Sequence, residues 1–248
     1  MAAMSAVAVV ALFIAGIAAG FINTVAGGGS VITIPVLVEV VGASVANGTL
    51  RIAIFMQNIS GITGYARGKA VPWRTVLPLI PPTTVGAVGG AWVATRLSAD
   101  SLEKIFAVAV VLVAVSVLIK PKGWDQSDEP RLRQPWTTLA FLSVGFYGGF
   151  VQAGVGFLFL AALVPGLGLG LVKGNAAKVT LIFCYIPFAL LLFVRADQVD
   201  WGAGLLVGAG SMIGAFLAST LAVRKGAGWI RWVLVFAAVA AALRMLLS

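Results

Sequence analysis

Two basic residues lie inside long apolar runs, where a charged side chain is costly. Arg51 lies in the segment NGTLRIAIFMQNISG and Lys178 lies in KGNAAKVTLIF, each a few residues after its run begins. A cation at the centre of a membrane helix costs about 2.5–3.5 kcal/mol, so such a pair is expected to face a cavity and meet an anion. We predict that Arg51 and Lys178 bind an anionic substrate. The alternatives are that both reach a membrane interface, or that one pairs with Glu39, the only acid within an apolar run.

Two glycine-rich segments, NTVAGGGS at 23–30 and QAGVG at 152–156, provide a second set of candidates. Glycine lets backbone N–H groups approach an oxyanion closely, and the first turn of a following helix adds partial positive charge. The alternative is that these glycines only allow close helix packing. The residues predicted to bind substrate here are Asn23, Thr24, Gly27, Gly28, Gly29, Ser30, Gln152 and Gly154. Thr49 is added because, like Asn47, Asn58 and Asn175, it either lines the path or forms interhelical hydrogen bonds.

The composition indicates a membrane protein. Of 248 residues, 60% are hydrophobic and 10% are charged, whereas soluble domains carry about 25% charged residues. With no histidine and one cysteine, Cys184, the chain lacks the side chains for a disulfide framework, a Cys/His zinc site or an imidazole base. We therefore predict no enzymatic activity, no cofactor and no metal site. The net charge of +9 is typical of basic cytoplasmic loops, and nucleic-acid binding is not expected.

Two uncharged or nearly uncharged runs are too long to be single membrane helices. The 36 residues of 6–41 would extend about 54 Å as continuous helix, against a hydrocarbon core of about 30 Å. The other run, 134–172, contains no charged residue. We predict that each run folds back as a hairpin, broken at glycines. These are Gly27, Gly28 and Gly29 in the first run, and Gly145, Gly148, Gly149, Gly154 and Gly156 in the second.

The two halves of the chain match one another. GFIN at 20–23 aligns with GFVQ at 149–152, Arg51 with Lys178, Trp73 with Trp201 and Gly86 with Gly214, at offsets of 127 to 129 residues. The alternative is chance similarity among small apolar residues. We predict a first repeat at 1–119, a cytoplasmic linker at 120–135 and a second repeat at 136–248, within one membrane domain.

The distribution of Lys and Arg predicts how the repeats are oriented. If each half is a hairpin plus three helices, the second half is inverted, and one side collects 11 Lys and Arg residues against 3 on the other. The side with the excess is expected to be cytoplasmic. The predicted fold is all-α, a polytopic transmembrane helical bundle of two inverted repeats. Inverted repeats are typical of secondary transporters, which bind substrate near the membrane midplane.

The order of the motifs resembles a known family. GFINTVAGGGSVITIPVL, ANGTLRIA, KGNAAKVTLIF and VDWGAGLLVGAGSMIGAFLASTLAVRKG together resemble the bacterial TauE/SafE sulfite exporters over nearly the whole chain. The resemblance implies a multi-pass carrier of the bacterial inner membrane that exports sulfite, sulfoacetate or related organosulfur anions.

We therefore predict a secondary transporter that exports a small sulfur oxyanion or sulfonate by alternating access. Two other functions stay open, namely an uptake carrier for another inorganic anion and a membrane scaffold without transport. Glu39 is the candidate for proton coupling, because it is the only acid within an apolar run. The predicted partners are the small anion and the lipid bilayer, and a homodimer stays open.

Overall fold

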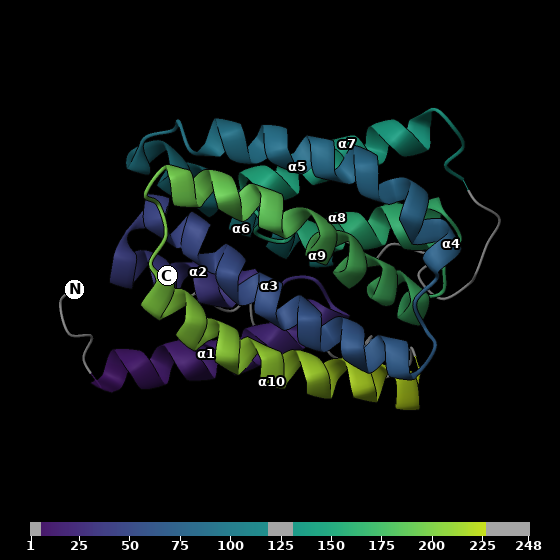
Figure 1. Cartoon of the computed structure of the whole chain (residues 1–248), viewed down its shortest axis with the longest axis horizontal. Coiled ribbons are helices and arrows are strands. Elements are labelled where there is room, and N and C mark those ends of the chain that lie inside the picture. Colours follow the sequence, from purple (N-terminus) through teal and green to yellow (C-terminus); the bar gives the residue numbers. More distant parts are fainter. Residues whose placement is uncertain (1–5, 119–130, 227–248) are drawn as a thin grey trace.

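The computed structural model describes residues 6–118 and 131–226, and every regular element in these two ranges is helical. The predicted all-α fold is confirmed. The helices pack side by side as a bundle (Figure 1). They are α1 (Ala6–Val25), α2 (Ser30–Val41), α3 (Ala43–Arg67), α4 (Trp73–Val76), η1 (Leu77–Leu79), α5 (Ile80–Ala94), α6 (Ala99–Leu118), α7 (Trp136–Phe150), α8 (Val155–Ala161), η2 (Ala162–Gly166), α9 (Leu171–Arg195) and α10 (Trp201–Lys225).

Four of the described helical segments are long and apolar enough to cross a membrane. They are Ala6–Val25, Trp73–Ala94, Leu171–Arg195 and Trp201–Lys225, and the second of these joins α4, η1 and α5 into one span. The predicted linker at 120–135 lies mostly outside the described residues, and so does the last predicted apolar run, 230–247.

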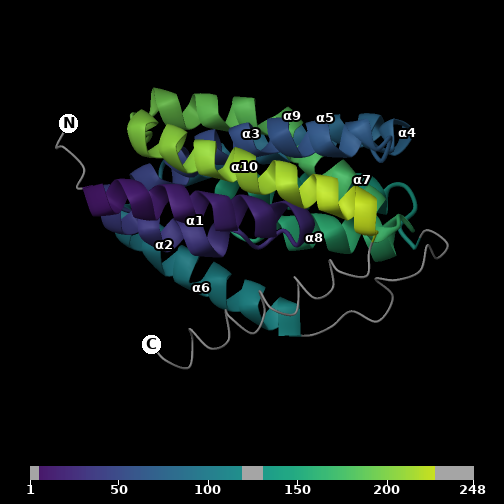
Figure 2. The ribbon, with the colours of Figure 1, turned by 90° about the horizontal axis from the view of Figure 1, so that it is seen from below.

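Both long apolar runs are interrupted. The first breaks between α1 and α2, where Gly27 has a φ of 91°, and the chain then returns beside α1 (Figure 2). The second breaks between α7 and α8, where Gln152 and Gly154 have φ values of 65° and 67°. Glycine enters this left-handed region easily, whereas other residues rarely do.

The glycines of the second run have a different role from the one predicted. Gly145, Gly148 and Gly149 lie inside α7 rather than at the break. A methyl group at Gly145 or Gly149 would collide with the backbone of α5, at Thr83 or Ala87. These two glycines therefore allow two helices to approach closely, which is a common use of small residues in membrane bundles.

The close contacts define the helix directions. Gly16 of α1 faces Val207 of α10, and further along both helices Gly214 faces Phe21, so α1 and α10 run parallel. In the same way, Gly204 of α10 faces Ile52 of α3, and Ser219 faces Gly64. The helices α1, α3 and α10 therefore run in one direction.

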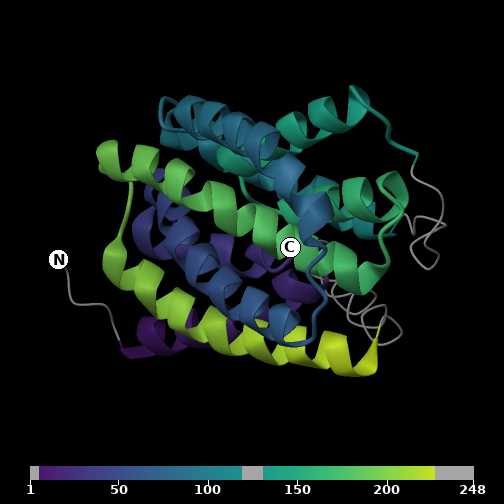
Figure 3. The same cartoon turned by 45° about the vertical axis from the view of Figure 1, so that its right-hand side comes forward.

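The helices that carry Arg51 and Lys178 run in opposite directions. The ring of Phe55 in α3 stacks on that of Phe183 in α9, with centroids 5.2 Å apart. Earlier in α3, Gly48 meets Phe193, and later Gly61 meets Val179. Residue numbers rise along α3 as they fall along α9, so α3 and α9 are antiparallel and lie side by side (Figure 3).

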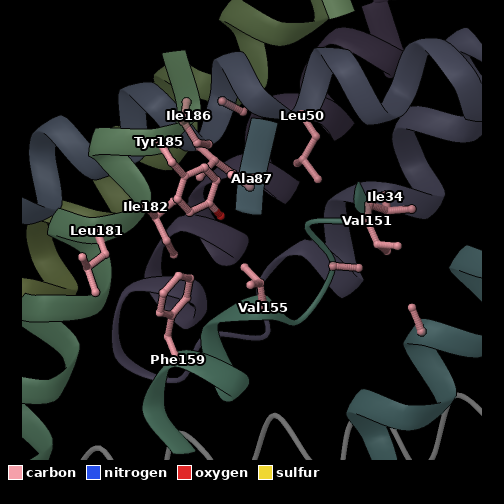
Figure 4. Close-up of a cluster of buried hydrophobic side chains, with 14 of the residues drawn as sticks. Ile34, Leu50, Ala87, Val151, Val155, Phe159, Leu181, Ile182, Tyr185 and Ile186 are labelled. Atoms are coloured by element: carbon pink, nitrogen blue, oxygen red, sulfur yellow. The ribbon is translucent and has the colours of Figure 1, made fainter. Parts of the chain in front are cut away.

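The largest apolar cluster surrounds the break between α7 and α8. Figure 4 shows Val151 and Val155 on either side of this break, with Tyr185 and Phe159 close by. All four are buried, and the rings of Phe159 and Tyr185 stack with centroids 6.3 Å apart. Because buried apolar side chains surround the break, the polar atoms there must find partners within the protein.

Candidate functional site

Arg51 of α3 lies against the C-terminal end of α7 and is fully buried, with 0% of its surface exposed. Its Nη1 donates to the carbonyl oxygen of Gly148 at 3.1 Å and to Gln152 Oε1 at 3.2 Å. Its Nη2 donates to the carbonyl oxygen of Gly149 and to Asn47 Oδ1 at 3.3 Å. The guanidinium also lies 4.5 Å from the centroid of the Phe193 ring, within the range of a cation–π contact.

In the corresponding way, Lys178 of α9 lies against the C-terminal end of α1 and is 1% exposed. Its Nζ donates to the carbonyl oxygens of Asn23 at 2.8 Å and Thr24 at 3.1 Å. The third acceptor is Asn175 Oδ1, at 2.6 Å on the same helix. Both cations are thus buried within the bundle, whereas Glu39 is exposed.

The two cations are arranged reciprocally. Arg51 in the first half binds the broken end of α7 in the second half, and Lys178 in the second half binds the broken end of α1 in the first. A helix C-terminus leaves carbonyl oxygens without internal partners and carries partial negative charge. Each cation therefore provides the donors and the positive charge that the broken helix needs.

The two breaks also touch each other. A methyl group at Gly27 would lie 2.5 Å from the carbonyl carbon of Gly156, so only glycines allow this contact. Beside it, the backbone N–H of Gly154 donates to Ser30 Oγ at 3.1 Å. The hairpin tips and the two cations thus form one continuous buried region, which we call the central cluster. Its predicted members are Arg51, Lys178, Asn23, Thr24, Gly27, Ser30, Gln152 and Gly154.

Gly28 and Gly29 pack beside the central cluster. Gly28 lies against the Phe157 ring, and a methyl group at Gly29 would meet the Ala19 carbonyl oxygen. A small cavity of about 10 Å³ opens next to them, with Asn23, Ser30 and Gln57 among its lining residues. That is room for about one water molecule.

Two of the predicted residues lie elsewhere. The hydroxyl of Thr49 accepts a hydrogen bond from the backbone N–H of Asp200 at 2.8 Å, at the start of α10. Among the described residues, no hydrogen bond joins the Thr49 side chain to Arg51 or Lys178. Glu39 lies near the end of α2 and is exposed. Its role in proton coupling stays a prediction.

Several residues of the central cluster were not expected from the sequence. Gln57 Oε1 accepts a hydrogen bond from Asn23 Nδ2 at 3.2 Å, and the hydroxyl of Tyr185 donates to Gln152 Oε1 at 3.0 Å. Gln57 and Tyr185 occupy matching positions in the two halves, 128 residues apart. That spacing, together with two polar side chains in apolar runs, is the signal that would have found them.

All the hydrogen-bond acceptors of the two cations among the described residues are amide or carbonyl oxygens. These bonds are worth about 1.5–3 kcal/mol each when the donor is charged, which is enough to offset the cost of burial. They leave two positive charges without a carboxylate partner inside a membrane protein. A site of this kind is a candidate for binding an anion.

The chain is similar in sequence to several curated proteins. A curated probable membrane transporter protein, ORF9 of Sinorhizobium sp, is 33% identical over 95% of this chain and 91% of its own length. The probable membrane transporter protein YfcA of Escherichia coli K12 is 32% identical over 89% of this chain and 82% of its own. A probable membrane transporter protein of Haemophilus influenzae is 28% identical over 89% of this chain and 87% of its own.

No solved structure gives a significant match to the chain. The family model described as sulfite exporter TauE/SafE matches residues 12–245, which is nearly the whole length. With its apolar helices, the chain is a multi-pass membrane protein and belongs to the TauE/SafE sulfite exporter family.

Proposed function

We propose that the protein is a secondary transporter that exports small sulfur oxyanions or organosulfonates across the bacterial inner membrane by alternating access. The family and the names of the relatives support a membrane transporter. The observation that carries the choice of an anion is the burial of Arg51 and Lys178 with neutral partners only. An anion with two negative charges would neutralise both.

We further propose that the halves are inverted repeats that move relative to each other. Three observations support this: matched sequence positions 127 to 129 residues apart, antiparallel α3 and α9, and the reciprocal binding of each broken helix by the other half's cation. Movement of one half away from the other would break both sets of hydrogen bonds. A bound anion would then offset the positive charge that the separated carbonyl oxygens had stabilised.

Export of this kind needs no coupling ion. The interior of a bacterial cell is electrically negative, so outward movement of one negative charge gains about 2.3 kcal/mol per 100 mV. We therefore expect flux to depend on membrane potential when neither protons nor sodium ions form a gradient. Glu39 would carry a proton only if this potential-driven flux is absent.

The test is a flux assay with purified protein in liposomes loaded with sulfite, sulfoacetate or sulfate, under an imposed potential. We expect sulfite or sulfoacetate efflux from the wild type, and a loss of at least ten-fold in Arg51→Ala and in Lys178→Ala. Arg96→Ala is the matched control, because Arg96 is exposed beyond the end of α5. No efflux of any of these anions from the folded wild type would refute the proposal.

A further inference from the structure

The two cations of the central cluster differ in how many of their donors are used. An ammonium group has three N–H donors, and those of Lys178 have three acceptors, namely two carbonyl oxygens and Asn175 Oδ1. A guanidinium has five donors. The four at Nη1 and Nη2 of Arg51 have four acceptors, but Arg51 Nε has none and is buried.

A second unused donor belongs to Gln152, which is hydrogen-bonded to Arg51. Gln152 Oε1 accepts from Arg51 Nη1 and from the Tyr185 hydroxyl, whereas Gln152 Nε2 is buried without a partner. Because arginine can only donate, the amide atom that faces Arg51 must be the oxygen. The NH₂ group is therefore directed away from its two partners. A buried donor left unpaired costs about 1–3 kcal/mol.

The backbone at Gln152 is also unfavourable. Its φ of 65° lies in the left-handed region, where a non-glycine residue costs about 1 kcal/mol or more. Glycine would adopt this conformation without that cost. Gln152 therefore combines a strained backbone with an unpaired side-chain donor, and it lies next to the cation of Arg51. Both side chains are more than nine-tenths buried. Such outliers collect at functional sites.

We infer that Gln152 and Arg51 are the direct ligands of the transported anion, through Gln152 Nε2 and Arg51 Nε. Lys178 is then a positioning residue, which holds the second half of the chain against the end of α1. This assignment rests on the proposed function, because it takes an anion to be the substrate. The ligand class is an oxyanion with at least two oxygens on one atom, such as sulfite or a sulfonate. One oxygen would accept from each donor.

Binding of an anion at these donors requires a movement of the helices. Both donor atoms are shielded from solvent, so an anion reaches them only after α3 separates from the break between α7 and α8. Lys178 lies at the other break, and its ammonium has no donor to spare. An anion that bound Lys178 directly would have to displace a carbonyl oxygen, whereas Gln152 and Arg51 can bind it with donors that are already unused.

The test is the substitution Gln152→Glu. The carboxylate keeps acceptors for Arg51 and Tyr185, and it forms an ion pair with Arg51, so the protein should melt at or above the wild-type temperature. It replaces the free NH₂ donor with a negatively charged oxygen that repels an anion. We expect the apparent Kd for sulfite, measured from thermal stabilisation by freshly prepared sodium sulfite, to rise by at least 30-fold.

Two further variants control for charge. Gln134→Glu makes the same change at an exposed site, where Oε1 accepts from the Thr138 hydroxyl at 2.7 Å, and its Kd should stay within two-fold of wild type. Asn175→Asp adds a negative charge next to Lys178 while keeping the acceptor for Nζ, and we expect a rise of less than ten-fold.

The outcomes separate the two proposals. If the wild type binds sulfite and Gln152→Glu binds it equally well, the assignment of Gln152 is wrong while the transport proposal stands. If Gln152→Glu and Asn175→Asp weaken binding equally, total charge rather than the Gln152 donor sets the affinity, which also overturns the assignment. If the wild type binds neither sulfite, sulfoacetate nor sulfate, both proposals fail.

Discussion

At the scale of single residues, the cost of burying Arg51 and Lys178 is offset by specific hydrogen bonds. Each cation lies at the negative end of a helix dipole and donates to carbonyl oxygens in the last turn of a broken helix. The cations are therefore stable in the closed arrangement. We expect the cations to give up these hydrogen bonds only when a negatively charged partner takes their place.

Lys178→Met tests the positioning role of Lys178. The change removes the charged donor from the carbonyl oxygens of Asn23 and Thr24, which then keep only the Gly27 N–H and the Tyr65 hydroxyl as donors. A hydrogen bond from a charged group is worth about 1.5–3 kcal/mol. We expect the midpoint of thermal unfolding in detergent to fall by several degrees. Lys173→Met is the matched control, because Lys173 is exposed near the start of α9; an equal fall in both variants would contradict the role.

Tyr185→Phe tests how Gln152 is held. The hydroxyl of Tyr185 is one of two donors to Gln152 Oε1, and a neutral hydrogen bond is worth about 1 kcal/mol. With Arg51 still in place, we expect the apparent Kd for sulfite to rise about three- to ten-fold, less than in Gln152→Glu. An unchanged Kd would show that Tyr185 does not position the amide.

At the scale of helices, the important feature is that the breaks in the two apolar runs touch each other. Gly27 and Gly156 meet backbone to backbone, and Ser30 Oγ accepts the Gly154 N–H across the contact. Helix α7 reaches this point because Gly149 lets it pack tightly on α5. Glycine thus has two separate uses here, at the breaks and along the helix contacts.

Gly156→Ala tests the contact between the tips. The added methyl group would collide with the backbone of Gly27, which cannot yield as a flexible side chain can. We expect a loss of stability of about 1–3 kcal/mol and a fall in sulfite flux of at least ten-fold. Gly170→Ala is the control: Gly170 has a φ of −61° and nothing within 4 Å of an added methyl, so both measurements should match the wild type.

At the scale of the whole molecule, the charged side chains divide between the two ends of the bundle. The end that holds the C-termini of α3 and α10 carries basic residues and no acid among the described residues: Arg67, Lys69, Arg74, Arg131, Arg133, Lys173, Arg224 and Lys225. The opposite end holds the five described acids: Glu39, Asp100, Glu103, Asp197 and Asp200.

Exposed tryptophans occur at both ends of the bundle. Trp73 and Trp136 lie at the basic end, and Trp92 and Trp201 lie at the other. Tryptophan is enriched at membrane interfaces, so this distribution is consistent with an interface at each end.

Thiol labelling tests the orientation that this division predicts. The basic end is expected to face the cytoplasm. In a Cys184→Ser background, which removes the one native thiol, Arg74→Cys lies at the basic end and Ser98→Cys at the other, both at exposed positions. In intact spheroplasts, a membrane-impermeant maleimide should label Ser98→Cys and leave Arg74→Cys unlabelled. The reverse pattern would show that the basic end faces outward.

Much of the fold follows from composition and run length. Sixty per cent hydrophobic residues and runs of 36 residues or more predicted helices in a membrane and two fold-backs, because lipid thickness limits the length of a span. The sequence did not distinguish glycines that break a helix from glycines that pack one. Gly154 and Gly149 are both small residues in an apolar run, and only the neighbouring backbone separates their roles.

The sequence by itself determined that Arg51 and Lys178 need partners, because a cation in an apolar run is costly wherever it lies. Only the tertiary structure decided who those partners are: carbonyl oxygens roughly 100 and 155 residues away, which become available because a helix from the other half ends beside each cation. The packing also places the Thr49 hydroxyl against the backbone N–H of Asp200 at the start of α10, and it leaves Gln152 Nε2 without a hydrogen-bond partner. Burial depends on composition along the chain, whereas hydrogen-bond partners depend on which helix ends the packing brings together.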